Sequence, residues 1–268
     1  PSEDERPDDC LSILSCSQRK LMDSKTTSND VLIHLKLDSI LESDNQATVP
    51  DSSGNDNAAI VHGSPKLVPD EMFGSCLRFN HSKDKAVDYL ELPAASKIFG
   101  RGWTFSIWMY LEKMPETDNV FSLVWAALST NNTYGVGINS DRYLVLDMND
   151  QKVASADQVK LNSWVHVAIA VQADGQASLW LDGQNIEGTV QVADENAAHK
   201  VTIGGFEDAS PSNLFQGKMA NIRIYNRALA TQEIQQQRSQ DLWPSLGFQE
   251  SSPLDFKLWD EQQKGAIY

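Results

Sequence analysis

The stretch WVHVAIAVQADGQASLWLDGQNIEG, residues 164–188, contains the strongest indication of the fold. It holds two Asp-Gly pairs, Asp174-Gly175 and Asp182-Gly183, and each lies between runs that favour β-strands. Asp-Gly is typical of a tight hairpin turn, because both central residues of such a turn adopt positive φ. The stretch therefore predicts an antiparallel meander of three strands.

Short β-prone runs continue this pattern over much of the chain, and only residues 231–240, TQEIQQQRSQ, are typical of a helix of any length. Many short strands without regularly intervening helices favour an antiparallel sandwich. Outside the meander, strands are expected at residues 31–37, 76–79, 89–93, 103–112, 120–128, 134–138, 143–148 and 199–206.

One more strand is expected within FQGKMANIRIYNRALA, residues 215–230, where it ends before a helical segment. Strict alternation places Ala220, Ile222 and Ile224 on one face of this strand.

Length and charge limit the classes of partner. The 268 residues suit one large all-β domain with extensions as well as two small domains. No apolar run is long enough to span a membrane, and the acidic opening PSEDERPDD is unlike a signal peptide. The formal net charge of −15, without a basic stripe, argues against nucleic acid as a partner.

Five landmarks appear in one order: DSSGNDNAAIVHG (51–63), CLRFN (76–80), WTFSIWMY (103–110), NSWVHVAIAVQADGQASLWLDGQ (162–184) and GKMANIRIYNRAL (217–229). In this order they resemble the laminin G-like group of the concanavalin A-like lectin and glucanase superfamily. The resemblance implies an all-β, antiparallel jelly-roll β-sandwich, here with short helical extensions. It also implies an extracellular or cell-surface location.

The resemblance divides the chain into three parts. Residues 31–239 form the expected sandwich, and residues 1–30 form a polar N-terminal arm. Residues 240–268 carry spaced aromatic side chains, and we expect this C-terminal tail to dock on the sandwich because an exposed apolar patch is costly.

Many relatives hold a structural Ca²⁺ between an Asp-rich loop and an acidic residue on the strand that closes the sandwich. In this chain the closing strand is the one expected within residues 215–230. The resemblance places Asp51, Asn55 and Asn57 in that loop, but Ala220 occupies the position of the acidic residue. Since a hard cation prefers several oxygen ligands, Ca²⁺ is a candidate cofactor whose site lacks one half. Weak binding and no binding both stay open.

The same resemblance also bears on which residue caps the N-terminus of the expected helix. Relatives carry Ser at the helix cap and Glu three positions later, whereas this chain has Ala230 and Glu233. Because alanine has no side-chain acceptor, we expect Thr231 to cap the helix one residue late.

Nothing in the sequence motivates catalysis. Glucanases of this superfamily carry Glu-x-Asp-x-x-Glu along one strand, because glycoside hydrolysis uses two facing carboxylates, and no strand here has that spacing. We therefore expect that the protein is not an enzyme. A polysaccharide-active enzyme is kept only as a third hypothesis.

The leading hypothesis is a lectin-like module that binds a glycan or a protein surface through loops at one rim. Its candidate ligand-binding residues are Asn131, Asn132 and Tyr134, which suit hydrogen bonds to hydroxyls, and Trp180, whose ring suits a sugar. Trp108 and Trp180 can share one sheet face, either open or covered. The alternative is an adaptor that joins a larger assembly through the N-terminal arm and the C-terminal tail.

Overall fold

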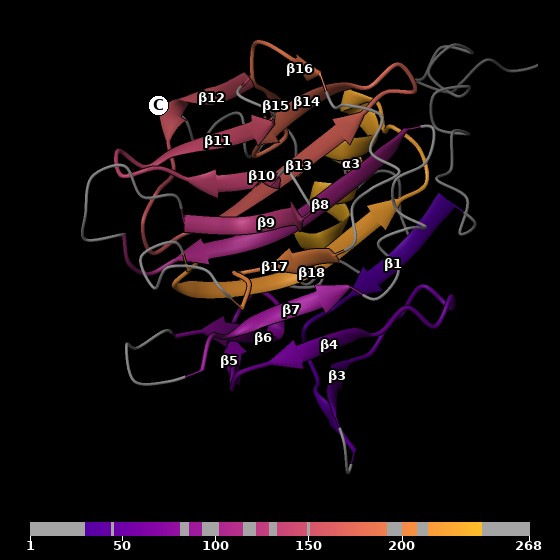
Figure 1. Cartoon of the computed structure of the whole chain (residues 1–268), viewed down its shortest axis with the longest axis vertical. Coiled ribbons are helices and arrows are strands. Elements are labelled where there is room, and N and C mark those ends of the chain that lie inside the picture. The colour runs from indigo at the N-terminus through magenta and orange to yellow at the C-terminus, as the bar shows by residue number, and fades with distance from the viewer. Residues whose placement is uncertain are drawn as a thin grey trace, which may run out of the picture.

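A computed structural model describes residues 30–43, 46–80, 86–92, 102–114, 122–128, 133–148, 151–191, 200–207 and 214–242. Most of the predicted N-terminal arm and C-terminal tail lies outside these residues. The described chain folds into two antiparallel sheets and one helix, so the predicted all-β antiparallel sandwich is confirmed (Figure 1).

The first sheet, called sheet A, is built around the closing strand. In spatial order it contains β15 (Gln184–Asn185), β14 (Gln176–Leu181), β13 (Trp164–Val171), β8 (Trp103–Leu111), β18 (Gly217–Tyr225), β6 (Gly74–Phe79) and β5 (Lys66–Asp70). Two further strands lie off this path: β1 (Val31–Leu35) pairs with β18, and β16 (Val190–Gln191) pairs with β14.

The second sheet, called sheet B, contains several short strands that the sequence did not predict. Its spatial order is β12 (Gln151–Gln158), β11 (Tyr143–Met148), β10 (Thr133–Ile138), β9 (Ser122–Leu128), β17 (Lys200–Ile203), β7 (Tyr89–Leu92), β4 (Ala59–His62), β3 (Ala47–Val49) and β2 (Leu41–Glu42).

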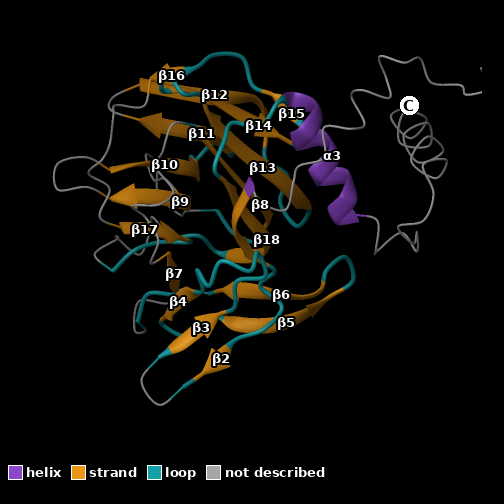
Figure 2. Ribbon diagram, turned by 90° about the vertical axis from the view of Figure 1, so that its right-hand side faces the viewer, coloured by secondary structure: helices purple, strands orange, loops and turns teal. Residues whose placement is uncertain are grey.

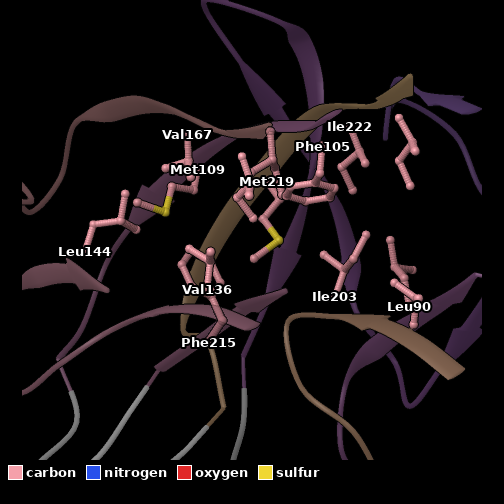
Figure 3. Packing of buried hydrophobic residues seen from close by; sticks show 14 of the residues in the cluster. Leu90, Phe105, Met109, Val136, Leu144, Val167, Ile203, Phe215, Met219 and Ile222 are labelled. Atoms are coloured by element: carbon pink, nitrogen blue, oxygen red, sulfur yellow. The ribbon is translucent and has the colours of Figure 1, made fainter. Parts of the chain in front are cut away.

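The core lies between the two sheets, where alternate residues of each strand meet. Figure 3 shows Phe105, Met109 and Met219 of sheet A pointing toward Val136 and Ile203 of sheet B. All five side chains are fully buried. Since an aliphatic side chain contributes about 2 kcal/mol on burial, this inner layer supplies most of the stability of the sandwich.

The predicted meander is present as β13, β14 and β15, but its two turns differ. At Asp182-Gly183 both residues have positive φ, 50° and 77°, as a two-residue hairpin turn requires. At the other turn only Gly175 has positive φ, 86°, because Ala173 also belongs to the loop that separates Gln172 from Gln176. The prediction of positive φ at both residues is therefore wrong for this first pair.

The closing strand β18 corrects the predicted alternation. Ala220 pairs with Trp108 on the outer face of sheet A, whereas Ile222 and Ile224 point into the core. The cause is a β-bulge at Asn221, which adopts a φ of 46° and donates its backbone N–H to the Lys36 carbonyl. An extra residue in one strand reverses the faces of the residues that follow it.

The only helix in the described residues, α3 (Thr231–Leu242), begins one residue earlier than its expected cap allows. Ala230 occupies the cap position, and its carbonyl accepts the backbone N–H groups of Glu233 and Ile234. The Glu233 carboxylate in turn accepts the Ala230 N–H at 2.9 Å, which is half of a capping box. The prediction that Thr231 caps the helix is therefore wrong.

Candidate functional site

Helix α3 covers part of the outer face of sheet A, on the side that faces away from sheet B (Figure 2). The predicted ligand-binding residue Trp180 lies under it, is 4% exposed, and packs with Tyr225, Leu229 and Ile234. The ring therefore has no face open to a ligand while α3 is in place. The structure answers whether the face with Trp108 and Trp180 is open: it is covered, and within the described residues the cover is α3.

Polar contacts, more than apolar ones, connect α3 to this face. The Asp241 carboxylate accepts hydrogen bonds from Arg223 at 2.7 and 2.8 Å, and from the Trp108 indole N–H at 2.9 Å. The side-chain amide of Gln237 donates to the same carboxylate at 2.7 Å. His166 lies fully buried beneath the helix, and this burial lowers its pKa to about 4. The imidazole is therefore neutral at pH 7.

Beyond α3 the outer face carries a partly buried cluster of one lysine, two aromatic rings and a carboxylate. The Lys218 ammonium lies 4.2 Å from the centre of the Tyr110 ring and 5.2 Å from that of Trp164. It also forms an ion pair with Asp70, whose carboxylate accepts the Trp164 indole N–H at 3.1 Å. Although burial opposes protonation, the bond to Asp70 raises the pKa of Lys218. Lys218 already occupies these ring faces, so the rings are not an open platform for a sugar.

Next to this cluster is an open hollow of about 440 Å³, here called the rim hollow. Strands β5 and β6 line it, together with the chain between β4 and β5, the residue that follows β6 and the chain ahead of β7. Val68 and Ala86 contribute apolar surface. Its polar lining residues are Ser64, Lys66, Arg78, Asn80 and Asp88.

The register of the ladder explains why two cations lie side by side in the rim hollow. Lys66 of β5 is the direct partner of Arg78 on β6, and Arg78 is in turn the partner of Lys218 on β18. Arg78 donates to the Glu112 carboxylate at 2.9 Å. Among the described residues Lys66 has no ion-pair partner.

Three carboxylates on this outer face are each bound to a cation. Asp70 pairs with Lys218, Glu112 with Arg78, and Asp241 with Arg223. Asp70, Glu112 and Asp241 thus serve as partners of neighbouring cations.

The predicted metal loop is held together by its own hydrogen bonds. The Asp51 carboxylate accepts the backbone N–H groups of His34, Ser53 and Asn57 and the Ser53 hydroxyl, at 2.7 to 3.0 Å. Although burial acts to raise it, these donors hold the pKa of Asp51 below its usual value. The amides of Asn55 and Asn57 donate to the Leu32 carbonyl, at 3.2 and 3.0 Å.

These residues do not fit a Ca²⁺ site as arranged. Both Asp51 oxygens and the Leu32 carbonyl already accept donors, while Ala220 has no side-chain oxygen and is buried beside Trp108 and Cys76. In the described ranges no group of three or more His, Cys, Asp or Glu residues is placed to hold a metal ion. Instead, these hydrogen bonds hold the loop that follows β3 against strand β1.

The remaining predicted rim residues lie apart from the rim hollow in the sequence. Tyr134 lies in β10, opposite Ala127 of β9, while Asn131 and Asn132 lie outside the described residues. Sequence reasoning missed the rim hollow, because its lining comes from three separate segments. The sequence signal available was the outward alternation of Lys66 and Val68, together with Arg78 in CLRFN.

Residues 84–235 match the family model described as the concanavalin A-like lectin/glucanases superfamily, in its laminin G group. This match spans more than half of the chain. The chain belongs to this superfamily. The laminin G-like resemblance predicted from the sequence is therefore confirmed. A search of curated protein sequences gives no match.

Solved structures with the same fold include enzymes and binding domains. A Trypanosoma rangeli sialidase in complex with sialic acid is 20% identical, with a TM-score of 0.62 over 80% of this chain and 33% of the sialidase chain. A botulinum neurotoxin type C structure, whose title describes interaction with two ganglioside molecules, is 15% identical, with a TM-score of 0.58 and shares of 80% and 52%.

A third structure is the binding domain of botulinum neurotoxin DC in complex with rat synaptotagmin II. It is 14% identical, with a TM-score of 0.56 over 80% of this chain and 52% of that chain. The laminin G-like chain thus spans between a third and about half of the length of these structures. At such identities the likeness shows the fold alone.

Proposed function

We propose that this laminin G-like chain is a non-catalytic carbohydrate-binding module whose ligand enters the rim hollow. The observation that carries the proposal is the hollow itself, an open cavity of about 440 Å³ with polar groups around a small apolar floor. Its size lies within the range of about 300–1,000 Å³ that is common for small-ligand sites. Lys66, Arg78, Ser64 and Asn80 supply hydrogen-bond donors that suit hydroxyl and acidic groups.

The state of the nearby carboxylates supports binding rather than hydrolysis. Asp70 is held in an ion pair with Lys218, and Glu112 is held in an ion pair with Arg78. Such an anion is stabilised in its charged form, which suits neither a general acid nor a free nucleophile. The proposal is therefore that sugars are bound and released unchanged.

Rim loops elsewhere can enlarge the binding surface. Asn131, Asn132 and Tyr134 are proposed as further ligand contacts, because amides and phenols suit sugar hydroxyls. Related folds support glycan and protein ligands alike, since these neighbours are described with sialic acid, gangliosides and synaptotagmin II. Of these two classes we favour glycans, because most residues that line the rim hollow carry hydrogen-bonding side chains beside the apolar Val68 and Ala86.

Two other predictions concern the location of the protein and its role in a larger assembly. An extracellular or cell-surface location follows from the family and is part of the proposal. The described residues contain no helix that is long and apolar enough to cross a membrane. The adaptor alternative depends on residues 1–29 and 243–268, which lie outside the described structure.

The proposal is tested by applying the protein of residues 1–268 to a broad glycan array. We expect a limited set of related glycans to bind, and we expect Asn80→Ala to weaken binding by about tenfold, because a hydrogen-bonding group is lost from the hollow. Silence across the array, with the protein folded by circular dichroism, would overturn the proposal. So would release of reducing ends from any bound glycan.

A further inference from the structure

The rim hollow opens onto a row of three cations in an otherwise acidic protein. Lys66, Arg78 and Lys218 are direct cross-strand partners on β5, β6 and β18, in a chain whose formal net charge is −15. Neighbouring strands are about 4.8 Å apart, so each cation faces the next at short range. Like charges directly opposite each other destabilise a sheet. The row therefore has an electrostatic cost that local anions must offset.

Local anions offset only two of the three cations. Lys218 is paired with Asp70, and Arg78 with Glu112. Among the described residues Lys66 has no such partner, although it is exposed on the edge strand β5. Lys66 is thus the one cation of the row that has no ion-pair partner among the described residues.

Among the described residues that line the rim hollow Asp88 is the one acidic residue, and it does not form an ion pair with Lys66. It is 5% exposed, and its carboxylate accepts the backbone N–H of Ser64 at 2.7 Å and that of Asn80 at 3.3 Å. In these bonds the carboxylate of Asp88 points toward the backbone that surrounds the hollow. Asp88 therefore fixes the wall and leaves Lys66 available to a ligand.

The guanidinium of Arg78 also has unused capacity. It contacts Glu112 through Nε at 2.9 Å and Nη2 at 2.8 Å, which leaves Nη1 for another acceptor. Arg78 remains exposed on the same side of the ladder as Lys66. A single acidic group can therefore receive hydrogen bonds from both cations.

We propose that the rim hollow selects glycans bearing one acidic group, a carboxylate or a sulfate, which Lys66 and Arg78 bind together. This inference rests on the proposed carbohydrate-binding function and names its ligand class. The net charge of −15 adds a limit, because a polyanionic chain would be repelled by the rest of the surface. A glycan with one acidic sugar gains the local attraction and avoids most of that repulsion, which is screened beyond about 8 Å.

The test uses array glycans in matched neutral and acidic forms, with sialic acid, uronic acid or sulfate as the acidic group, and heparin as the polyanion. Titration calorimetry on the protein of residues 1–268 then compares Lys66→Gln with Lys152→Gln. Lys152 is an exposed lysine on β12, at the edge of the other sheet, so its replacement removes the same charge elsewhere. Comparing the sialic and uronic acid glycans with the sulfated glycans shows whether the bound acidic group is a carboxylate or a sulfate.

We expect the acidic member of each bound pair to bind more tightly, heparin to bind less well than the single-acid glycan, and added salt to weaken binding. Lys66→Gln should lower the affinity for that glycan about tenfold, while Lys152→Gln leaves it unchanged. Equal affinity for neutral members, or an unchanged affinity of Lys66→Gln, would overturn this inference and leave the proposed function standing. Binding of no glycan at all would overturn both.

Discussion

Arg223 of β18 and Asp241 of α3 form a two-pronged ion pair, with N–O distances of 2.8 and 2.7 Å. Both side chains are largely buried, and the same carboxylate accepts the indole N–H of Trp108. A bidentate pair fixes orientation as well as distance. The pair therefore holds α3 in one position over the face that contains both Trp108 and Trp180.

Replacing Asp241 with Ala should release α3 from the sheet. Arg223 would be left as a buried charge without its partner, which costs on the order of 3 kcal/mol. The measurement is urea denaturation followed by tryptophan fluorescence. Gln240→Ala, at an exposed position of the same helix, is the control. A loss no larger than that of the control would mean that the ion pair does not hold the helix.

Two buried histidines predict loss of stability in mild acid. Burial lowers the pKa of His34 and of His166 from 6.5 to about 4. The unfolded chain therefore takes up protons first as the pH falls. The stabilisation is complete above pH 6.5 and declines between pH 6.5 and 4, by roughly 3 kcal/mol for each histidine.

This pH dependence is measured as the unfolding free energy at steps between pH 7.5 and 4. Asp241, Arg238 and Arg223 are the charged groups that act on His166, and they stay in place in a His166→Gln variant. That variant should have a shallower decline than the wild-type protein. Identical slopes would show that His166 does not take up its proton on unfolding.

Asp51 should stabilise the loop that joins β3 to β4. Asp51→Asn keeps the shape but turns one acceptor into a donor that faces other donors, so we expect a loss of about 2 kcal/mol in the unfolding free energy. Asp38→Asn is the matched control, because Asp38 is exposed and accepts only the neighbouring Ser39 hydroxyl. Equal stability of the two variants would contradict the role assigned to Asp51.

Added Ca²⁺ should leave the melting temperature of the protein unchanged. A ligand that binds the folded state raises stability in proportion to RT ln(1 + [L]/Kd), and the Asp51 loop has no free set of oxygens for the ion. Differential scanning fluorimetry in 1 to 10 mM CaCl₂ against EGTA, about 10² to 10³ times a Kd near 10 µM, makes the comparison sharp. A saturable rise that Asp51→Asn abolishes would contradict the account.

The bulge at Asn221 should tolerate glycine but not valine. The φ of 46° lies in the left-handed region, where a β-branched side chain costs about 1–2 kcal/mol and glycine costs little. Denaturation of Asn221→Val and Asn221→Gly measures the difference directly. Equal stability would show that the bulge relaxes when the side chain changes.

Local chemistry predicted much of the fold. Asp182-Gly183 specifies a hairpin from two adjacent residues, and the meander follows wherever such turns separate alternating strands. The bulge at Asn221 was not predicted, because strict alternation of side chains assumes that no extra residue is inserted into the strand. One such residue was enough to move Ala220 to the opposite face from Ile222.

The candidate site depended on information that the sequence does not carry. Lys66 and Arg78 lie on the consecutive strands β5 and β6, but Lys218 of β18 is far from both in the chain and becomes their neighbour only through the register of the sheet. Trp180 looked available because a strand pattern does not reveal which element covers its outer face. Only the packing of α3 decides that its ring is buried.

The most direct test of glycan binding at the rim hollow is backbone amide NMR during titration with the tightest-binding glycan from the array. We expect the largest chemical-shift changes at Ser64, Lys66, Arg78 and Asn80. Smaller changes should extend toward Lys218 along the ladder. Saturable changes confined to other parts of the surface, with these amides unmoved, would contradict the account.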